Sequence, residues 1–308
     1  MTSSESIQYP QKVREHQHHL LDSKIWNAFT FRDDDIIIGT YSKSGTTWVQ
    51  QIVAQLLWKG AEHINVNALS PWLDCAFPSQ EERLAQVEAQ THRRFLKSHL
   101  PVDTLAFSPR AKYLYIARDG RDVLWSLYNH HRKFKKDVIR SIDGAPWRVG
   151  PPLGDAPASV LHYFRNWLAH DGAPWWPYWE HIRSWWAIKD LPNVMLLHFA
   201  RLKADMSAEI RRIAAFLDIA IDENVWDAIL KHCSFQYMKT HGAITVPFAG
   251  ELWEGGVSTF MHKGNNKKWK DILTLEDIER YERTAKEQLG PACAHWLATG
   301  MLSNTTNV

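Results

Sequence analysis

Short apolar or β-branched runs alternate with longer stretches of helical spacing along this chain, and this alternation constrains its fold more than any other feature. The short runs lie at 36–38, 94–97, 113–117 and 193–199. Helical spacing is found at 46–59, 121–133 and 207–217. Strands that alternate with helices form parallel sheets covered by helices. The sequence therefore predicts an α/β fold in which helices flank a central, largely parallel sheet.

The composition is that of an ordinary globular protein, with 45% hydrophobic and 23% charged residues among 308. We predict a single domain over residues 1–308, with a loosely ordered start at 1–20, because no linker, repeat or low-complexity tract divides the sequence. The sequence contains neither a run of membrane-spanning length nor a secretory signal. Together with three scattered cysteines, this favours a cytoplasmic protein with reduced thiols. The net charge of +2 is too small to indicate a nucleic-acid partner.

The strongest local signal is the segment 41–48, Tyr-Ser-Lys-Ser-Gly-Thr-Thr-Trp, between the first predicted strand and the first predicted helix. Backbone N–H groups at a helix start bind phosphate, and Lys43 would add positive charge. The alternative is a Ser/Thr-capped helix with a solvated lysine. A Walker A motif places its lysine directly after the last glycine, whereas here Lys43 precedes Gly45. This order disfavours a P-loop kinase, which would also need ligands for Mg²⁺.

A second signal follows the strand at 113–117, because ligands bind at the carboxyl ends of strands in open α/β sheets. Arg118 stands at that end and is placed to bind a second phosphate, with Ser126 in the helix that follows. We interpret Arg121 and Asp122 as a surface ion pair.

A third signal is His99, which stands between the strand at 94–97 and a proline turn. A neutral imidazole at a strand end that faces a ligand is a natural base for a hydroxyl. The chain holds 16 histidines, most of them scattered, and we expect His130 and His131 to face solvent from the helix at 121–133.

Long loops are predicted at 142–154 and 242–266, and such loops are usually lids or binding loops. The second loop carries a basic cluster at 260–270, which could close over an anionic ligand or could simply be solvated. A group of tryptophans is interpreted mainly as packing, with an acceptor-binding wall as the alternative. These tryptophans are Trp167, Trp175, Trp176, Trp179, Trp185 and Trp186.

In their order along the chain, these motifs resemble those of the cytosolic sulfotransferase family. Residues 40–48 resemble the family loop TYPKSGTTW, with Ser42 in place of proline. Residues 97–101 resemble its KTHLP segment, and residues 118–126 its RDxxDVxxS segment. The segments similar to its YDHVxxWW, FYEDM, TSF and FMRKGxxGDW motifs lie at 179–186, 197–202, 233–235 and 260–269.

The resemblance implies a P-loop-like sulfotransferase fold and an enzyme that needs no metal. Its co-substrate would be 3′-phosphoadenosine 5′-phosphosulfate (PAPS), from which a sulfuryl group passes to a hydroxyl, releasing PAP. The residues implied in catalysis are His99 as base, Lys43 at the leaving oxygen, Lys97 near the sulfuryl oxygens, and Ser126, which would restrain Lys43 until an acceptor arrives.

The resemblance also implies a nucleotide site. It would comprise Lys43, Ser44, Gly45, Thr46, Thr47, Trp48, Arg118, Ser126, Phe199, Cys233, Phe235, Met261, His262, Lys263 and Gly264. Several positions depart from the family pattern: Phe199 replaces tyrosine, Cys233 threonine, His262 a lid arginine, and 267–268 are Lys-Lys in place of Gly-Asp. These departures leave a catalytically altered nucleotide-binding relative as an alternative. A dehydratase that eliminates a sulfated alcohol is another.

The loops at 71–80, 142–154 and 240–256 are rich in aromatic residues and proline. They suit a small apolar or aromatic acceptor, such as a phenol, an alcohol, a sterol-like molecule or a glycolipid. A last segment resembles the family's KxxxTVxxxE dimer motif and implies a weak homodimer, although a Thr-started helix with exposed charges would give the same pattern. Its residues are Lys270, Thr274, Leu275 and Glu279.

Overall fold

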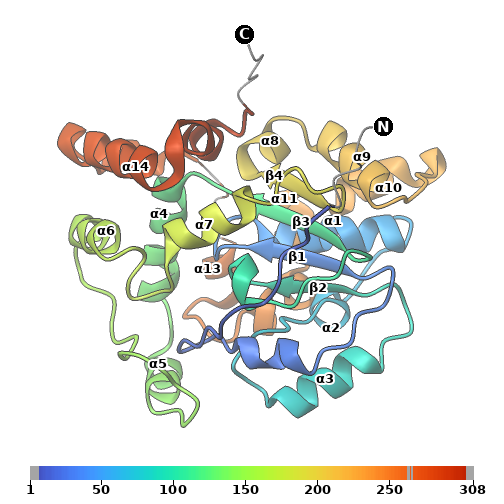
Figure 1. Ribbon diagram of the computed structural model, residues 1–308, viewed down its shortest axis with the longest axis horizontal. Helices are drawn as coiled ribbons and strands as arrows, with labels where there is room; N and C mark the ends of the chain where they lie inside the picture. The colour runs from blue at the N-terminus through green and yellow to red at the C-terminus, as the bar shows by residue number, and fades with distance from the viewer. Residues whose placement is uncertain (1–6, 262–263, 265, 303–308) are drawn as a thin grey trace.

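A parallel sheet lies at the centre of the computed structural model, which describes residues 7–261, 264 and 266–302 (Figure 1). Its strands are β1 (Ile36–Thr40), β2 (Phe95–Ser98), β3 (Lys112–Ala117) and β4 (Val194–His198), in the spatial order β2-β1-β3-β4. β1 pairs with both β2 and β3, so that Ile36 lies opposite Phe95 and Lys112. All four predicted strands are confirmed, and their carboxyl ends lie at one edge of the sheet.

Helices cover both faces of this sheet (Figure 1). In the first part of the chain they are α1 (Thr46–Leu57), α2 (Val66–Leu69), α3 (Gln80–Glu88), α4 (Gly120–Arg132), α5 (Lys136–Asp143), α6 (Val160–Ala169) and α7 (Tyr178–Trp186). In the second part they are α8 (Phe199–Ala204), α9 (Met206–Phe216), α10 (Trp226–His232), α11 (Phe235–Thr240), α12 (Gly242–Thr245), α13 (Gly256–Phe260) and α14 (Leu275–Thr299). The predicted helices correspond to α1, α4 and α9. The region 242–266, expected to be a loop, contains the short helices α12 and α13.

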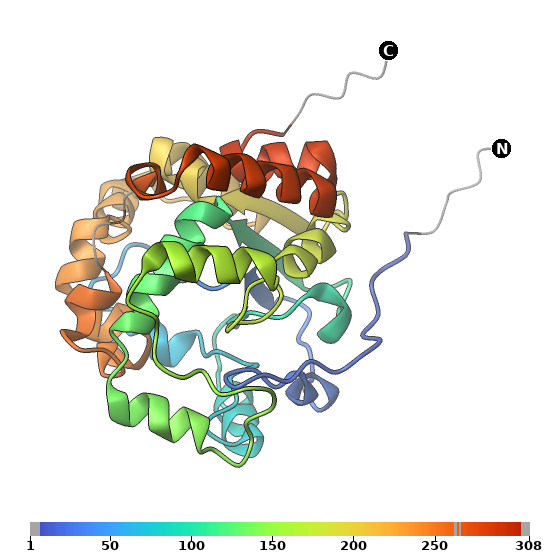
Figure 2. The ribbon, with the colours of Figure 1, turned by 90° about the vertical axis from the view of Figure 1, so that its left-hand side faces the viewer.

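Two hydrophobic cores share the sheet, because successive strand residues point to opposite faces. Ile36 and Ile38 pack into one core with residues of α1, α9 and α10. Ile37 packs into the other with residues of α4, α6, α7 and α14. Figure 2 views this second side, with the red α14 above the yellow-green α6.

The first described residues pack against this body. His19 and Leu20 are buried, and Arg14 is paired with Asp103 at 2.6 Å and with Glu180. The loosely ordered start expected for residues 1–20 therefore does not fit residues 7–20, because the apolar side chains at the end of this segment reach the core. No helix in the described part of the chain is long and apolar enough to cross a membrane.

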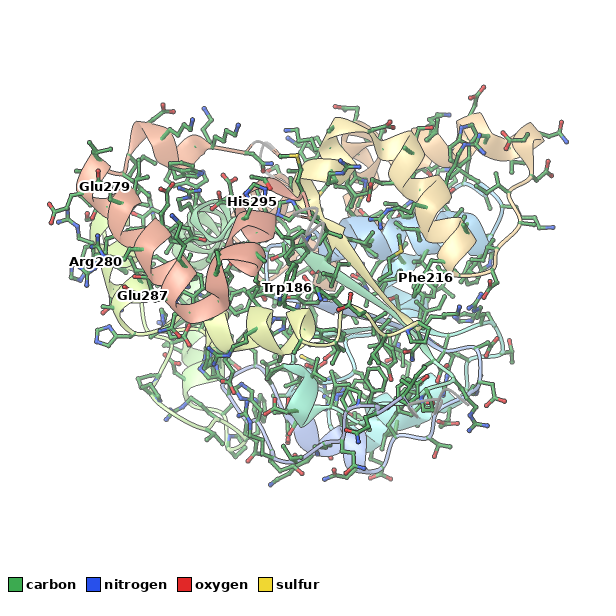
Figure 3. The ribbon with its side chains drawn as sticks, turned by 45° about the horizontal axis from the view of Figure 1, so that its top comes forward. Trp186, Phe216, Glu279, Arg280, Glu287 and His295 are labelled. Atoms are coloured by element: carbon green, nitrogen blue, oxygen red, sulfur yellow. The ribbon has the colours of Figure 1, made fainter. Side chains whose placement is uncertain are left out.

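The long helix α14 covers the start of α4. The Tyr281 hydroxyl accepts a hydrogen bond from the Gly120 N–H at 3.0 Å. At Gly120, a Cβ atom would lie 2.5 Å from that hydroxyl. α14 also packs on α7, where the rings of Trp186 and Trp296 lie 5.3 Å apart; Figure 3 labels Trp186 beneath this helix. The first turn of α4 is thus completed by a residue far along the chain.

In the first turn of α4, Arg121 and Asp122 differ from their prediction. Arg121 is buried and pairs with Asp119 at 2.7 Å and with Glu282 at 2.9 Å. Asp122 is buried as well, and it accepts a hydrogen bond from the Lys267 N–H at 2.6 Å. The prediction of a surface ion pair between Arg121 and Asp122 is therefore wrong, because both side chains point under the covering segments.

Most of the clustered tryptophans form core, as predicted. Trp167, Trp176, Trp179 and Trp185 are buried in the cluster between the sheet and α4, α6, α7 and α14. Trp175 is also buried, but one side of it lines the cavity described below. This one residue fits the alternative interpretation of an acceptor-binding wall.

Candidate active site

The loop between β1 and α1 has a left-handed backbone at two positions. Lys43 has a φ of 67° and Gly45 a φ of 117°. A Cβ atom at Gly45 would lie 2.8 Å from Cδ1 of Ile116 and 3.0 Å from the Phe199 ring. Glycine is therefore required here by both backbone conformation and space.

The start of α1 presents unpaired backbone donors. Its N-cap residue is Gly45, which has no side chain that could accept a hydrogen bond from the first turn. Among the residues that the structure describes, none accepts a hydrogen bond from the N–H groups of Gly45, Thr46 or Thr47. These donors and the helix dipole together make an anion site.

Arg118 adds a positive charge beside this loop. It directly follows β3, and one of its N–H groups lies 3.4 Å from the Lys43 carbonyl oxygen. Its guanidinium lies 4.3 Å from the centre of the Phe199 ring and donates to Oδ1 of Asn266 at 2.8 Å. Burial lowers the pKa of Arg118, which nevertheless stays a cation because arginine titrates far above neutral pH. Two phosphate-binding elements predicted from separate motifs are thus adjacent.

Aromatic rings lie next to Arg118. Trp48 and Phe199 meet edge to face at 5.5 Å. The Trp48 indole donates to the Cys233 carbonyl oxygen at 2.9 Å. A Cβ atom at Gly264 would lie 3.1 Å from the Phe235 ring. The predicted nucleotide residues from five distant segments therefore meet in one place, and the contact from Cys233 runs through its backbone.

His99 is held in one neutral form. Its Nδ1 lies 2.7 Å from the Thr40 carbonyl oxygen, which can only accept, so Nδ1 carries the proton and Nε2 keeps a lone pair. The backbone N–H of His99 donates to the Asp74 carboxylate at 3.0 Å. Burial, together with the charge of Lys97, lowers the His99 pKa to about 3. The imidazole is thus neutral and its free nitrogen can accept a proton.

Lys97 lies beside His99. Its Nζ is 4.8 Å from the centre of the Trp72 ring, and that ring meets the His99 imidazole edge to face at 4.8 Å. Burial lowers the pKa of Lys97 to about 8. The ammonium remains largely charged at neutral pH, close to the imidazole.

Lys43 has an unexpected neighbour. Its Nζ lies 3.2 Å from Nδ1 of His130 and 4.0 Å from the centre of the Phe260 ring. Burial lowers the Lys43 pKa to about 7, helped by the charges of Arg118 and Lys97. Ser126 was expected to restrain Lys43, but the described hydrogen bond of this ammonium is with His130. Ser126 itself is half-buried on α4.

The prediction that His130 and His131 face solvent is wrong. His130 is largely enclosed by aromatic rings, of which Trp253 is nearest at 4.4 Å. His131 is buried, and its Nε2 lies 2.9 Å from the Gly154 carbonyl oxygen. These two residues are covered because the segments at 153–175 and 250–260 pack over them.

A cavity of about 430 Å³ joins these groups. We call the part of its lining around the residues predicted to bind the nucleotide the nucleotide compartment, and the part around His99 the acceptor compartment. The nucleotide compartment is lined by Ser42, Lys43, Gly45, Thr46, Thr47, Trp48, Arg118, Phe199, Lys203, Phe235, Met238, Met261 and Gly264. The acceptor compartment is lined by Leu20, Trp72, Phe77, Lys97, His99, Leu127, His130, Phe134, Ile142, Trp175, Pro247, Phe248, Leu252, Trp253 and Phe260.

Some predicted site residues lie off this lining. Ser44 is buried, and its hydroxyl has no hydrogen-bond partner in the described part of the chain. Ser126 and the Cys233 side chain do not line the cavity. His262 and Lys263 lie outside the described residues. The other predicted site residues, from the loop, β2, β3 and the segments after β4, all line the cavity.

Besides Ser42 in the phosphate loop, sequence reasoning missed two polar residues of the lining. Lys203 on α8 donates to the Gly264 carbonyl oxygen at 2.6 Å, and no local motif marks it. His130 stands four residues after Ser126 on α4, a spacing that places two side chains on the same helix face. That spacing was a signal that could have pointed to it.

The chain is similar to known sulfotransferases in sequence. Residues 33–291 match the family model described as Sulfotransferase domain. A glycolipid sulfotransferase of Mycobacterium bovis is 29% identical, over 91% of this chain and 93% of its own length. Sulfotransferase 1B1 of Mus musculus is 30% identical, over 83% of this chain and 82% of its own length.

Solved structures agree in fold. Mouse sulfotransferase SULT7A1 complexed with PAP has a TM-score of 0.66 at 18% identity, covering 89% of this chain and 91% of its own. Retinol dehydratase in complex with retinol and PAP has a TM-score of 0.68 at 22% identity, covering 86% and 84%. The predicted fold class and the predicted enzyme class are confirmed. With a matched domain that spans most of its length, this chain belongs to the sulfotransferase family.

Proposed function

We propose that this sulfotransferase transfers the sulfuryl group of PAPS to a hydroxyl of a small apolar or aromatic acceptor and releases PAP. The observation that carries the proposal is the position of Lys43. Its carbonyl oxygen lies against Arg118 in the nucleotide compartment, and its ammonium lies against His130 in the acceptor compartment. A bound nucleotide and a bound acceptor would therefore meet at this residue.

The nucleotide compartment fits PAPS in its donors and its rings. The free N–H groups of Gly45, Thr46 and Thr47 suit the phosphosulfate. Arg118 suits the 3′-phosphate, and Ser126 on α4, which lies off the cavity lining, is its predicted second partner. The aromatic rings of this compartment suit the adenine base, and they belong to Trp48, Phe199 and Phe235.

The acceptor hydroxyl is proposed to donate to Nε2 of His99, which takes the proton as the oxygen attacks sulfur. The Thr40 carbonyl oxygen keeps the other ring nitrogen protonated, so the basic nitrogen is fixed. PAPS supplies the sulfuryl group and a phosphate leaving group. Lys43 is proposed to donate to the leaving oxygen, and Lys97 to offset charge on the sulfuryl oxygens. Negative charge from the nucleotide would raise the His99 pKa toward a useful range.

The charge of the cavity limits the acceptors. The described lining includes the cations Lys43, Lys97, Arg118 and Lys203 and no Asp or Glu. A positively charged amine would therefore find no carboxylate partner in the described lining. Neutral or anionic hydroxyl compounds, such as phenols, fit better, and the aromatic walls suit flat rings.

Three alternatives to this function make different predictions. A P-loop kinase is disfavoured by the loop order in which Lys43 precedes Gly45. A nucleotide-binding relative without turnover is disfavoured because Lys43, Lys97 and His99 line one cavity. A dehydratase would use the same first step and then eliminate sulfate from the activated alcohol.

The test is a mass-spectrometric screen of phenols, alcohols, sterols and glycolipids with PAPS and purified protein. We expect a product that gains one sulfuryl group, together with PAP. A product that has lost water would identify the dehydratase. Tight PAP binding without any product would identify the altered relative, and ATP binding tighter than PAP would support the kinase.

We also propose a cytoplasmic location, one sulfotransferase domain and a weak homodimer. The dimer would form through Lys270, Thr274, Leu275 and Glu279, at the start of α14. The Leu275 side chain is 71% exposed, although it is apolar. Glu279 lies on the outer side of the same helix, where Figure 3 labels it. The small size of this segment predicts a dilution-sensitive dimer.

A further inference from the structure

His130 is a polar residue within an aromatic wall. Its ring is surrounded by Trp253 at 4.4 Å, Phe134 at 5.1 Å and Phe260 at 5.6 Å between ring centres. It lines the cavity from α4, whereas His99 lines it from the end of β2. A polar side chain in such a wall has a cost unless it meets a polar partner.

The proton of His130 can be placed from its contact with Lys43. In its charged form, which a bound anionic nucleotide favours, the Lys43 ammonium has only donors, so Nδ1 of His130 accepts at 3.2 Å. A neutral imidazole then carries its proton on Nε2. Burial and the charge of Lys43 lower the pKa of His130 well below its usual range, which agrees with a neutral ring. His99 has the opposite arrangement, with the free lone pair on Nε2.

The Nε2–H of His130 is available to a ligand. It has no hydrogen-bond partner in the described part of the chain, and it is not among the fully enclosed unpaired atoms. The indole N–H groups of the same wall are not available in this way. Those of Trp72 and Trp253 are enclosed, and that of Trp175 donates to the Tyr163 hydroxyl at 2.6 Å.

We propose that His130 is an acceptor-specificity residue, whose Nε2–H donates a hydrogen bond to an oxygen of the acceptor other than the reacting hydroxyl. The acceptor class is therefore a flat phenol or alcohol with a second oxygen, such as an ether or a carbonyl, on its apolar frame. This inference rests on the proposed function, because it assumes that the acceptor compartment binds the sulfated molecule.

The test compares acceptors that differ in one atom. Each monomethoxy naphthol is paired with the monoethyl naphthol of the same substitution pattern, in which a CH₂ group replaces the ether oxygen. The ratio of kcat/KM within each pair is measured with PAPS. For the wild-type protein we expect at least one methoxy isomer to be preferred by about tenfold, because a buried donor without its partner is costly.

Three variants separate the two nitrogens of His130. His130→Phe removes both and keeps the ring. In His130→Gln the amide nitrogen lies near the former Nε2, so a donor to the acceptor is kept. In His130→Asn the amide oxygen can lie near the former Nδ1, so an acceptor for the Lys43 ammonium is kept, whereas no donor takes the place of the former Nε2–H. We expect the preference to be retained in the Gln variant and to fall to about one in the Phe and Asn variants. Thermal melting confirms that each variant is folded.

The inference is overturned if the wild type shows no preference in any pair, or if His130→Phe keeps the preference. It is also overturned if the preference is lost in His130→Gln but kept in His130→Asn, since the effect would then run through Lys43. Dissociation constants of the same pairs for the PAP complex, from tryptophan fluorescence, give the same ratios without turnover. A protein that binds the pairs selectively but makes no product would contradict the proposed function alone.

Discussion

The ammonium nitrogen of Lys43 lies 3.2 Å from Nδ1 of His130, a neutral partner that accepts a hydrogen bond but supplies no negative charge. Burial and two nearby cations lower the pKa of Lys43 to about 7. An anionic nucleotide would raise it again, because an opposite charge favours the ammonium. Binding should therefore take up a proton when the pH exceeds the value for the free protein.

The first prediction is that PAP affinity falls as the pH rises above about 7, by up to tenfold per pH unit. Lys97, whose pKa is about 8, should add to the fall at higher pH. Calorimetry between about pH 6 and about pH 9, in buffers of different ionisation enthalpy, counts the protons taken up. Lys43→Met should remove the part that begins near pH 7. A PAP affinity that does not depend on pH would contradict the lowered pKa of Lys43.

His99→Ala should reduce sulfuryl transfer by about 10²–10⁴-fold, because the proposed general base is lost. PAP affinity should change little, since the described contacts of the ring are with Thr40, Trp72 and Trp176. Turnover and PAP binding are measured separately. Near wild-type turnover at saturating acceptor would show that another group removes the proton.

Arg118→Ala should weaken PAP binding far more than binding of the same nucleotide without its 3′-phosphate. Ser126→Ala should act in the same direction but less, because a hydroxyl offers one neutral hydrogen bond and this one lies off the cavity lining. Calorimetry with both nucleotides gives the comparison. If the two nucleotides lose affinity equally, neither residue binds the 3′-phosphate.

Gly45→Ala tests the shape of the phosphate loop. Alanine is unfavourable in the left-handed backbone conformation of this position, and its methyl group would clash with Ile116 and Phe199. Gly150→Ala is the matched control, because Gly150 has a φ of 84° and open space around it. Gly150→Ala should lower the free energy of unfolding by about 1–2 kcal/mol. Gly45→Ala should lower it by about 1–3 kcal/mol more. Denaturant unfolding of both variants, with and without PAP, measures the difference, and equal costs would argue against close packing at this loop.

Leu275→Glu should convert a weak dimer into monomers, because it places a charge on the exposed apolar residue of the proposed contact. Sedimentation across a concentration series is the measurement. Activity should persist in the monomer, since every residue assigned to the site comes from one chain. A wild-type protein that stays monomeric at high micromolar concentration would end the proposal.

The strands and the central site residues could be predicted from sequence because their signals are local. A short apolar run followed by a glycine turn indicates a parallel strand and its ligand-binding end. Lys43, His99 and Arg118 each stand at such an end, and parallel pairing brings those ends to one edge. Three separate motifs therefore predicted one site.

The covering segments could not be predicted in this way. His130 and Arg121 look solvent-exposed on an isolated amphipathic helix, and they are enclosed because segments more than one hundred residues away fold over α4. Leu20 reaches the cavity from the other end of the chain. Such packing leaves no periodic pattern in the sequence, since it depends on how distant loops meet.

The hydrogen bond between Gly120 and Tyr281 has a consequence for how the protein is made. Synthesis proceeds from the N-terminus, so the turn that carries Arg118 leaves the ribosome long before α14 does. Until Tyr281 is synthesised, the N–H of Gly120 lacks the hydroxyl that accepts its hydrogen bond, and Arg121 lacks its contact with Glu282. In a nascent chain, the turn that carries Arg118 would thus reach its final structure only at the end of translation, when the last long helix docks.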